Sequence, residues 1–106
     1  MHEAGLVRAA VAALIEVTGG RRLRAAVLAV SADVDVDSAA AAWQAAAAGT
    51  CLEGTSVTWR REPDRLRCFT CGREYDGEAL AHCPSCGGTG IVVTRAAEIA
   101  VDEWVM

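Results

Sequence analysis

The chain opens with a helical pattern of hydrophobic residues. From Glu3 to Val17 the apolar side chains recur at steps of three and four residues: Leu6, Val7, Ala10, Val11, Leu14 and Ile15. That period places them on one face of an α-helix. Gly19-Gly20 follows at once and is typical of a helix end. We therefore predict an amphipathic first helix that packs on a core through this face.

A second helix is expected in the alanine-rich segment. Ser38 is a plausible N-cap, and the segment runs to Ala48 before Gly49, which favours a helix end. Trp43 is the only large side chain in it. This helix must therefore be anchored mainly by one tryptophan.

Strands are predicted between and after the helices. The stretch from Leu23 to Ala32 is apolar at both parities, as in a buried strand. Ser56 to Glu62 alternates, with Val57 and Trp59 on one face, and Pro63-Asp64 ends it. Ile91–Val93 and Ile99–Val105 are predicted to be short strands that return to the main sheet. The expected fold class is α+β, a small sheet packed with two helices.

The cysteines change this picture. Four of the five form two C-x-x-C pairs, Cys68/Cys71 and Cys83/Cys86, and a glycine follows each pair. Zinc takes four thiolates in a tetrahedron, and such pairs present two ligands each from a tight turn. We predict one zinc ion bound by Cys68, Cys71, Cys83 and Cys86 in a ribbon-like module. Thiol–disulfide exchange is the competing interpretation.

The predicted zinc is structural, because a complete thiolate shell leaves no open position for water or substrate. His82 directly precedes a ligand, so replacement of a thiolate by His82 is left open. The remaining thiol, Cys51, is expected to be inert.

The module divides the chain. Its glycine, cysteine and charged residues differ sharply from the segments on either side. We predict a discontinuous α+β domain from residues 1–66 and 89–106, with residues 67–88 inserted as the zinc-binding ribbon.

Composition and charge limit the function classes. Much of the 53% hydrophobic content is alanine, so the core depends on few large residues and gains from a metal. The formal net charge of −4 argues against nucleic acid as a main partner. No apolar run reaches the ~20 residues that span a bilayer, and no signal peptide opens the chain. We expect a cytoplasmic protein that does not bind membranes.

The amino terminus offers a second metal site of different chemistry. The α-amine of Met1 with the amide and imidazole nitrogens of His2 can chelate one ion, and Glu3 can supply a fourth donor. A square of nitrogen and oxygen donors suits Ni(II) or Cu(II), whereas zinc favours the thiolates. The alternative is an ordinary frayed terminus.

Together these features resemble the HypA family of hydrogenase-maturation nickel metallochaperones. The resemblance rests on Met1-His2-Glu3, Gly49-Thr50 followed by Glu53-Gly54, the paired cysteine turns, Trp43 before Gly49, and a closing strand near Ile99. It spans nearly the whole chain. Ala4-Gly5 and Asp33-Val34-Asp35 depart from the usual Leu-Ser and Gly-Glu-Leu-like patterns of the family.

The resemblance implies a function. It implies that His2, with donors from Met1 and Glu3, binds nickel for delivery, and that the four cysteines hold zinc. It further implies two partners, the GTPase HypB and the large subunit of a nickel–iron hydrogenase; some relatives also serve urease.

Two other classes of function remain as alternatives. A zinc-ribbon adaptor for protein or nucleic acid would make no use of Met1-His2-Glu3. An enzyme is not expected, because the sequence offers two histidines and no nucleophile with an obvious base.

Overall fold

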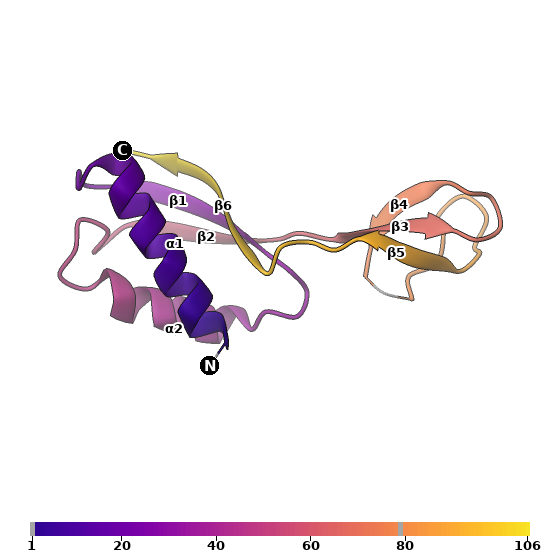
Figure 1. Cartoon of the computed structure of the whole chain (residues 1–106), viewed down its shortest axis with the longest axis horizontal. Coiled ribbons are helices and arrows are strands. Elements are labelled where there is room, and N and C mark those ends of the chain that lie inside the picture. The colour runs from indigo at the N-terminus through magenta and orange to yellow at the C-terminus, as the bar shows by residue number, and fades with distance from the viewer. Residues whose placement is uncertain (1, 79) are drawn as a thin grey trace.

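The computed structural model describes residues 2–78 and 80–106, and for His2 and Glu3 it describes the backbone alone. In chain order the elements are α1 (His2–Thr18), β1 (Ala25–Val30), α2 (Val36–Ala47), β2 (Ser56–Arg61), β3 (Asp64–Cys68), β4 (Glu74–Gly77), β5 (Gly90–Thr94) and β6 (Ile99–Val105). Two sheets lie at opposite ends of an elongated molecule of 52 × 26 × 17 Å (Figure 1). The predicted α+β class is confirmed.

The first sheet has β1 at its centre, in the order β2-β1-β6. β1 and β2 are parallel and are connected through α2, which supplies the crossover that parallel neighbours need. β6 returns from the far end of the molecule and pairs antiparallel with β1. The two edge strands of the first sheet, β2 and β6, therefore come before and after the second sheet in the sequence.

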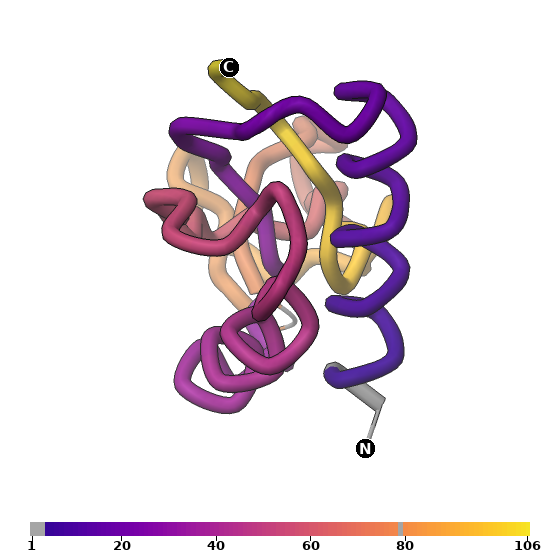
Figure 2. The backbone as a smooth tube through the Cα atoms, turned by 90° about the vertical axis from the view of Figure 1, so that its left-hand side faces the viewer, coloured from indigo at the N-terminus to yellow at the C-terminus, as the bar shows by residue number. Residues whose placement is uncertain are grey.

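Both helices cover the same face of the first sheet (Figure 2). The apolar residues predicted for α1 supply Val7, Val11 and Leu14 to the core, and Trp43 of α2 is 2% exposed. Trp43 meets Trp59 of β2 edge to face at 6.5 Å between ring centroids. Such aromatic pairs contribute about 0.5–1.5 kcal/mol beyond burial, which matters in an alanine-rich core.

The prediction that Ser38 caps α2 is wrong. Asp35 is the N-cap: its Oδ1 accepts hydrogen bonds from the amides of Asp37 and Ser38 at 3.0 and 3.4 Å. The Ser38 hydroxyl donates to Asp35 Oδ2 at 3.2 Å, inside the first turn. The far end agrees better with expectation, since α2 ends at Ala47 and Gly49 has φ +75°.

The second sheet has the order β4-β3-β5, with all its pairs antiparallel. The prediction that Ile91–Val93 returns to the main sheet is therefore wrong, because β5 pairs with β3. Only Val92 of this apolar run packs on the small core of the second sheet, while Ile91 and Val93 are 54% and 46% exposed. Ile99–Val105 does return to the first sheet, as predicted.

Two stretches of chain join the sheets, one between β2 and β3 and one between β5 and β6 (Figure 1). They are tied together where Asp64 Oδ1 accepts a hydrogen bond from the Ala96 amide at 2.7 Å. Arg61, the last residue of β2, donates hydrogen bonds to the Ser31 and Val34 carbonyls in the loop after β1, at 2.6 and 2.8 Å. None of the described helices is long and apolar enough to span a membrane.

Candidate metal centre

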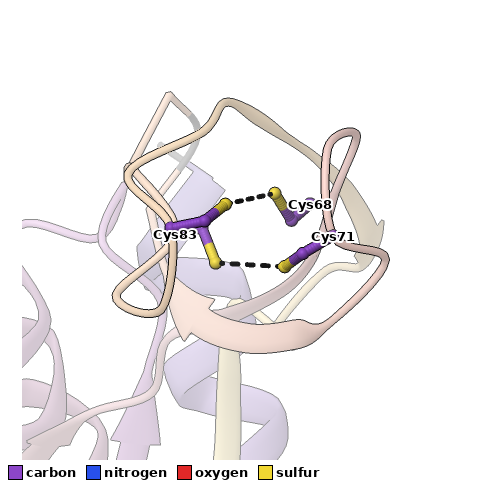
Figure 3. Close-up of side chains that lie close together, drawn as sticks. Cys68, Cys71 and Cys83 are labelled. Carbon is purple, nitrogen blue, oxygen red and sulfur yellow. Dashed lines mark hydrogen bonds between the residues drawn. The ribbon is translucent and has the colours of Figure 1, made fainter.

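The four cysteines of the two C-x-x-C pairs meet at the end of the second sheet farthest from the helices (Figures 1 and 3). Cys68 ends β3, Cys71 lies in the turn that follows, and the other pair lies in the turn before β5. All four Sγ atoms lie within 4.8 Å of one another. The Cys68–Cys86 and Cys71–Cys83 sulfur pairs are 3.5 and 3.7 Å apart. We call these four residues the cysteine cluster.

The cluster fits a tetrahedral metal ion. Thiolates at about 2.3 Å from a zinc ion lie about 3.8 Å from one another along the edges of the tetrahedron. The two sulfur separations are close to that edge length, and all five cysteines are free thiols. The donor set and its spacing therefore suit a soft tetrahedral ion better than they suit paired disulfides.

Each pair sits in a tight turn, or knuckle: Cys68–Gly72 is the first knuckle and Cys83–Gly87 the second. Gly72 and Gly87 both have φ +75°, a conformation that favours glycine. Their amides donate to the Cys68 and Cys83 carbonyls at 3.0 and 2.8 Å and close the turns. The glycine that follows each cysteine pair in the sequence thus shapes both halves of the site.

Backbone amides favour thiolates in both knuckles. The amide of Cys71, with that of Thr70, lowers the pKa of Cys68 to about 6. The amide of Cys86, with that of Ser85, lowers the pKa of Cys83 in the same way. Hydrogen bonds to the charged form stabilise it, so two of the four ligands are prepared for metal.

The opposite effect acts on Cys86. The Gly88 amide lowers its pKa, but the neighbouring sulfurs, Cys68 first, outweigh this and raise the pKa to about 11. Four sulfurs at these separations cannot all carry charge without a cation among them. A divalent ion is the group that would offset their repulsion.

The cluster packs on the small core of the second sheet with one side and faces solvent with the other. Cys68 and Cys83 are buried with Leu66 and Tyr75 in the small core of the second sheet, whereas Cys71 and Cys86 are exposed. A Cβ at Gly88 would lie 3.1 Å from Cys68 Sγ and 3.3 Å from Cys86 Sγ. The sequence analysis did not identify Leu66 or Gly88 as neighbours of the site. The second glycine after Cys86 was the available signal.

Among the described residues, only the four cysteines form the cluster. His82 is exposed and pairs with Thr89 in an isolated β-bridge. Cys51 packs against the core of the first sheet. His2 and Glu3 begin α1, and their side chains, like the whole of Met1, lie outside the described residues.

A cluster of four thiols on one sheet and a second sheet covered by two helices define the class: a small metal-binding protein of α+β fold. Comparison with known proteins narrows it. The family model "Hydrogenase/urease nickel incorporation, metallochaperone, hypA" matches residues 1–106. The chain belongs to the HypA family. This is a family of metallochaperones, so the prediction that the chain is not an enzyme is confirmed.

Individual relatives agree. The hydrogenase maturation factor HypA of Geobacter metallireducens is 31% identical over 106 residues, covering 97% of this chain and 96% of its own. That of Chlorobaculum tepidum is 31% identical over 112 residues, covering 100% and 99%. The solution structure of the Ni metallochaperone HypA from Helicobacter pylori superposes with TM-score 0.66 at 15% identity, covering 98% of this chain and 96% of that one. The last likeness concerns the fold alone.

Proposed function

We propose that this chain binds Ni(II) at its amino terminus and delivers it during maturation of nickel–iron hydrogenase. The observation that carries the proposal is the family match, which extends over residues 1–106 and so includes Met1-His2-Glu3. In this proposal His2 contributes its imidazole and amide nitrogens, Met1 its amine, and Glu3 a further donor. Nitrogen and oxygen donors of this kind suit nickel.

Delivery depends on ligand exchange. The proposed donors come from three consecutive residues at one end of α1, so an acceptor can replace them one at a time without opening the core. The core of the first sheet begins its contacts with α1 at Val7, one turn further along the helix. The helix would thus present the cargo, and the sheet beneath it would hold the helix in place.

The cysteine cluster takes the other role in the proposal. Cys68, Cys71, Cys83 and Cys86 would hold a zinc ion, whose contribution is charge neutralisation and cross-linking of the two knuckles. The near-tetrahedral sulfur spacing and the lowered pKa of Cys68 support this assignment. We further propose a discontinuous α+β domain with an inserted ribbon, the ribbon extending beyond the predicted residues 67–88 to the whole second sheet, from Asp64 to Thr94.

The cellular setting follows from the family. We propose that the chain acts in the cytoplasm with the GTPase HypB, and that the large subunit of a nickel–iron hydrogenase receives the metal. The family description also names urease, so a urease is a second possible recipient.

Nickel titration tests the proposal. The chain has two histidines, so His2→Ala has a matched control in His82→Ala. We expect His2→Ala to weaken nickel binding by at least about tenfold, equivalent to about 1.4 kcal/mol. The variant loses the imidazole ligand and the chelate ring that this ligand closes with the metal. His82→Ala should bind nickel as the unchanged chain does. Isothermal titration calorimetry measures both.

A second variant separates the amine from the imidazole. One glycine added before Met1 leaves His2 and Glu3 in place but moves the α-amine out of the chelate. We expect a loss similar to that of His2→Ala. Unchanged nickel affinity in both variants would contradict the terminal site and favour the zinc-ribbon adaptor.

A further inference from the structure

Tyr75 makes an unusual connection beside the cysteine cluster. It lies in β4, is 5% exposed, and its hydroxyl donates a hydrogen bond to the Ala81 carbonyl at 2.6 Å. Ala81 stands two residues before Cys83, the first ligand of the second knuckle. The side chain therefore links the strand that follows the first knuckle to the segment that leads into the second.

Glycine makes room for this connection. A Cβ on Gly90 would overlap the Tyr75 hydroxyl and lie 3.0 Å from its Cζ, so no larger residue fits while the ring keeps its place. Gly77 does the same on the other side, where a Cβ would lie 2.9 Å from the Ala81 Cβ. Ala81 is thus bonded through its carbonyl to Tyr75, and the absence of a side chain at Gly77 leaves room for its methyl.

The ring also belongs to the small core that carries the ligands. Tyr75 packs with Leu66, Cys68 and Cys83, one cysteine from each knuckle. Its hydroxyl reaches past this core and donates to the Ala81 carbonyl. The first knuckle is also joined to the chain that follows the second: the Phe69 amide donates to the Thr89 carbonyl at 3.0 Å, and Cys68 pairs with Gly90 in the β3–β5 ladder. The His82–Thr89 bridge closes the second knuckle on itself.

We propose that Tyr75 is a positioning residue that locks the two knuckles in tetrahedral register and so keeps nickel out of the cysteine cluster. This rests on the proposed function, in which zinc occupies the thiols and nickel is cargo. Nickel favours planar arrangements, and four thiols could reach one only if the knuckles rotated against each other. Such a rotation must move Ala81 away from Tyr75.

A rigid cysteine cluster of this kind would discriminate between zinc and nickel by the geometry that it allows. Thiolates bind nickel strongly, so a chaperone with a pliable cluster would trap its own cargo there. Tyr75 opposes that by a bond remote from the metal itself. Zinc, which accepts the tetrahedral arrangement already present, is retained.

The test is Tyr75→Phe, which keeps the ring and removes the hydroxyl. Zinc release to the chromophoric chelator 4-(2-pyridylazo)resorcinol should become about three- to tenfold faster, the range that loss of one hydrogen bond gives. With nickel added in excess, the variant should gain thiolate-to-nickel charge-transfer absorbance that the unchanged protein lacks. Gly90→Ala, which displaces the ring, should act in the same direction.

Two controls separate this role from general loosening. Thr58→Val removes a hydroxyl from an exposed position of β2, and Gly5→Ala adds a methyl where no atom lies within 4 Å. Both should release zinc at the unchanged rate. Tyr75→Phe should also keep the tryptophan fluorescence of the first core, because its effect is confined to the second sheet.

The outcomes are distinct. Equal zinc release and no charge-transfer band in Tyr75→Phe would overturn the proposal even if nickel binds at the terminus as expected. If the purified protein carries no zinc, the proposed function fails in that respect. The comparison is then made on the metal-free chains with a thiol reagent: faster modification of the cluster in Tyr75→Phe supports the lock, and equal rates overturn it.

Discussion

The side chain of Asp35 caps the amino-terminal end of α2. Its two carboxylate oxygens take up two backbone amides and the Ser38 hydroxyl, groups that the first helical turn cannot satisfy itself. Its negative charge also lies at the positive end of the helix dipole. The cap therefore acts on the helix that supplies Trp43 to the core.

Replacement of Asp35 by alanine should lower the free energy of unfolding by about 1 kcal/mol, the usual cost of a lost N-cap. Ser38→Ala should cost clearly less, since Ser38 donates to the cap and is not the cap. Thermal unfolding followed by tryptophan fluorescence measures both. Asp33→Ala, an exposed carboxylate in the same loop, is the control. Equal losses in the Asp35 and Ser38 variants would contradict this assignment.

The wrong prediction at this position has a physical cause. Asp and Ser are both good N-caps, and they stand three residues apart, so each can begin a helical turn at a plausible place. Hydrophobic period does not decide between them, because the only large residue of the helix is Trp43. The choice depends on Val34 and Val36, which pack against the core and bring the start of the helix forward.

At the scale of elements, β3 and β4 are joined by ion pairs on their exposed face. Glu74 accepts from Arg67 at 2.7 Å and from Arg65 at 3.4 Å, and Arg65 also reaches Asp76 at 2.8 Å. Arg67, followed by Arg65, lowers the pKa of Glu74. These pairs add cross-strand contacts to a sheet whose apolar core is small.

The stabilisation from Glu74 should depend on pH. Its folded pKa lies below the unfolded value of about 4.3, so the contribution is present above that pH and is lost as the pH falls through the folded pKa. Glu74→Gln should therefore lower the melting temperature of the second sheet slightly at pH 7, and the difference should vanish in acid. Circular dichroism from pH 7 to pH 3 measures it.

Glu53→Gln, at an exposed position before β2, is the control for the loss of one carboxylate. This variant should not change the melting temperature of the second sheet at any pH in this range. A difference between Glu74→Gln and the unchanged chain that grows on acidification would have the wrong sign and would contradict the argument.

The sequence predicted some strands well and others poorly for reasons that concern periodicity. Ser56–Glu62 alternates, so its strand and its buried face could be predicted, and Val57 and Trp59 do pack on the core. Ile91–Val93 is a short apolar run without alternation, and such a run does not tell which sheet it joins. Its place beside β3 depends on the second knuckle, which directs the chain back along the second sheet.

The cysteine cluster was the most predictable part of the site, because ligand spacing is a local property. Two C-x-x-C pairs, each followed by glycine, contain most of the geometry that the structure shows. The Tyr75–Ala81 bond and the space left by Gly90 were not predictable, since they depend on how β4 and β5 face each other across β3.

At the scale of the whole molecule, the two sheets have separate cores and separate aromatic reporters. All three tryptophans lie in elements of the first sheet and its helices, while the single tyrosine lies in β4. Among the described residues, the second core has four buried members with Ala81 and Val92 packed on them, too few to be stable without a cross-link.

Removal of metal should therefore unfold the second sheet alone. With a chelator such as EDTA, we expect the near-ultraviolet dichroism of Tyr75 to be lost and the fluorescence of Trp43 to persist, because binding free energy at such a site is folding free energy. Added zinc should restore the tyrosine signal. Simultaneous loss of both signals would contradict the independence of the two cores.

The narrow connection between the sheets has a consequence for how the protein would handle two metals. Two adjacent stretches of chain cross from one sheet to the other, tied by the Asp64–Ala96 bond, and α1 and the second sheet lie on opposite sides of this crossing (Figure 1). Exposed charges separated by more than about 8 Å are largely screened at physiological ionic strength. We therefore expect little direct electrostatic coupling between the ends, so that a metal at the amino terminus would bind with an affinity that does not depend on the charge of the cluster. The molecule would behave as two metalloproteins that share one polypeptide and keep separate equilibria.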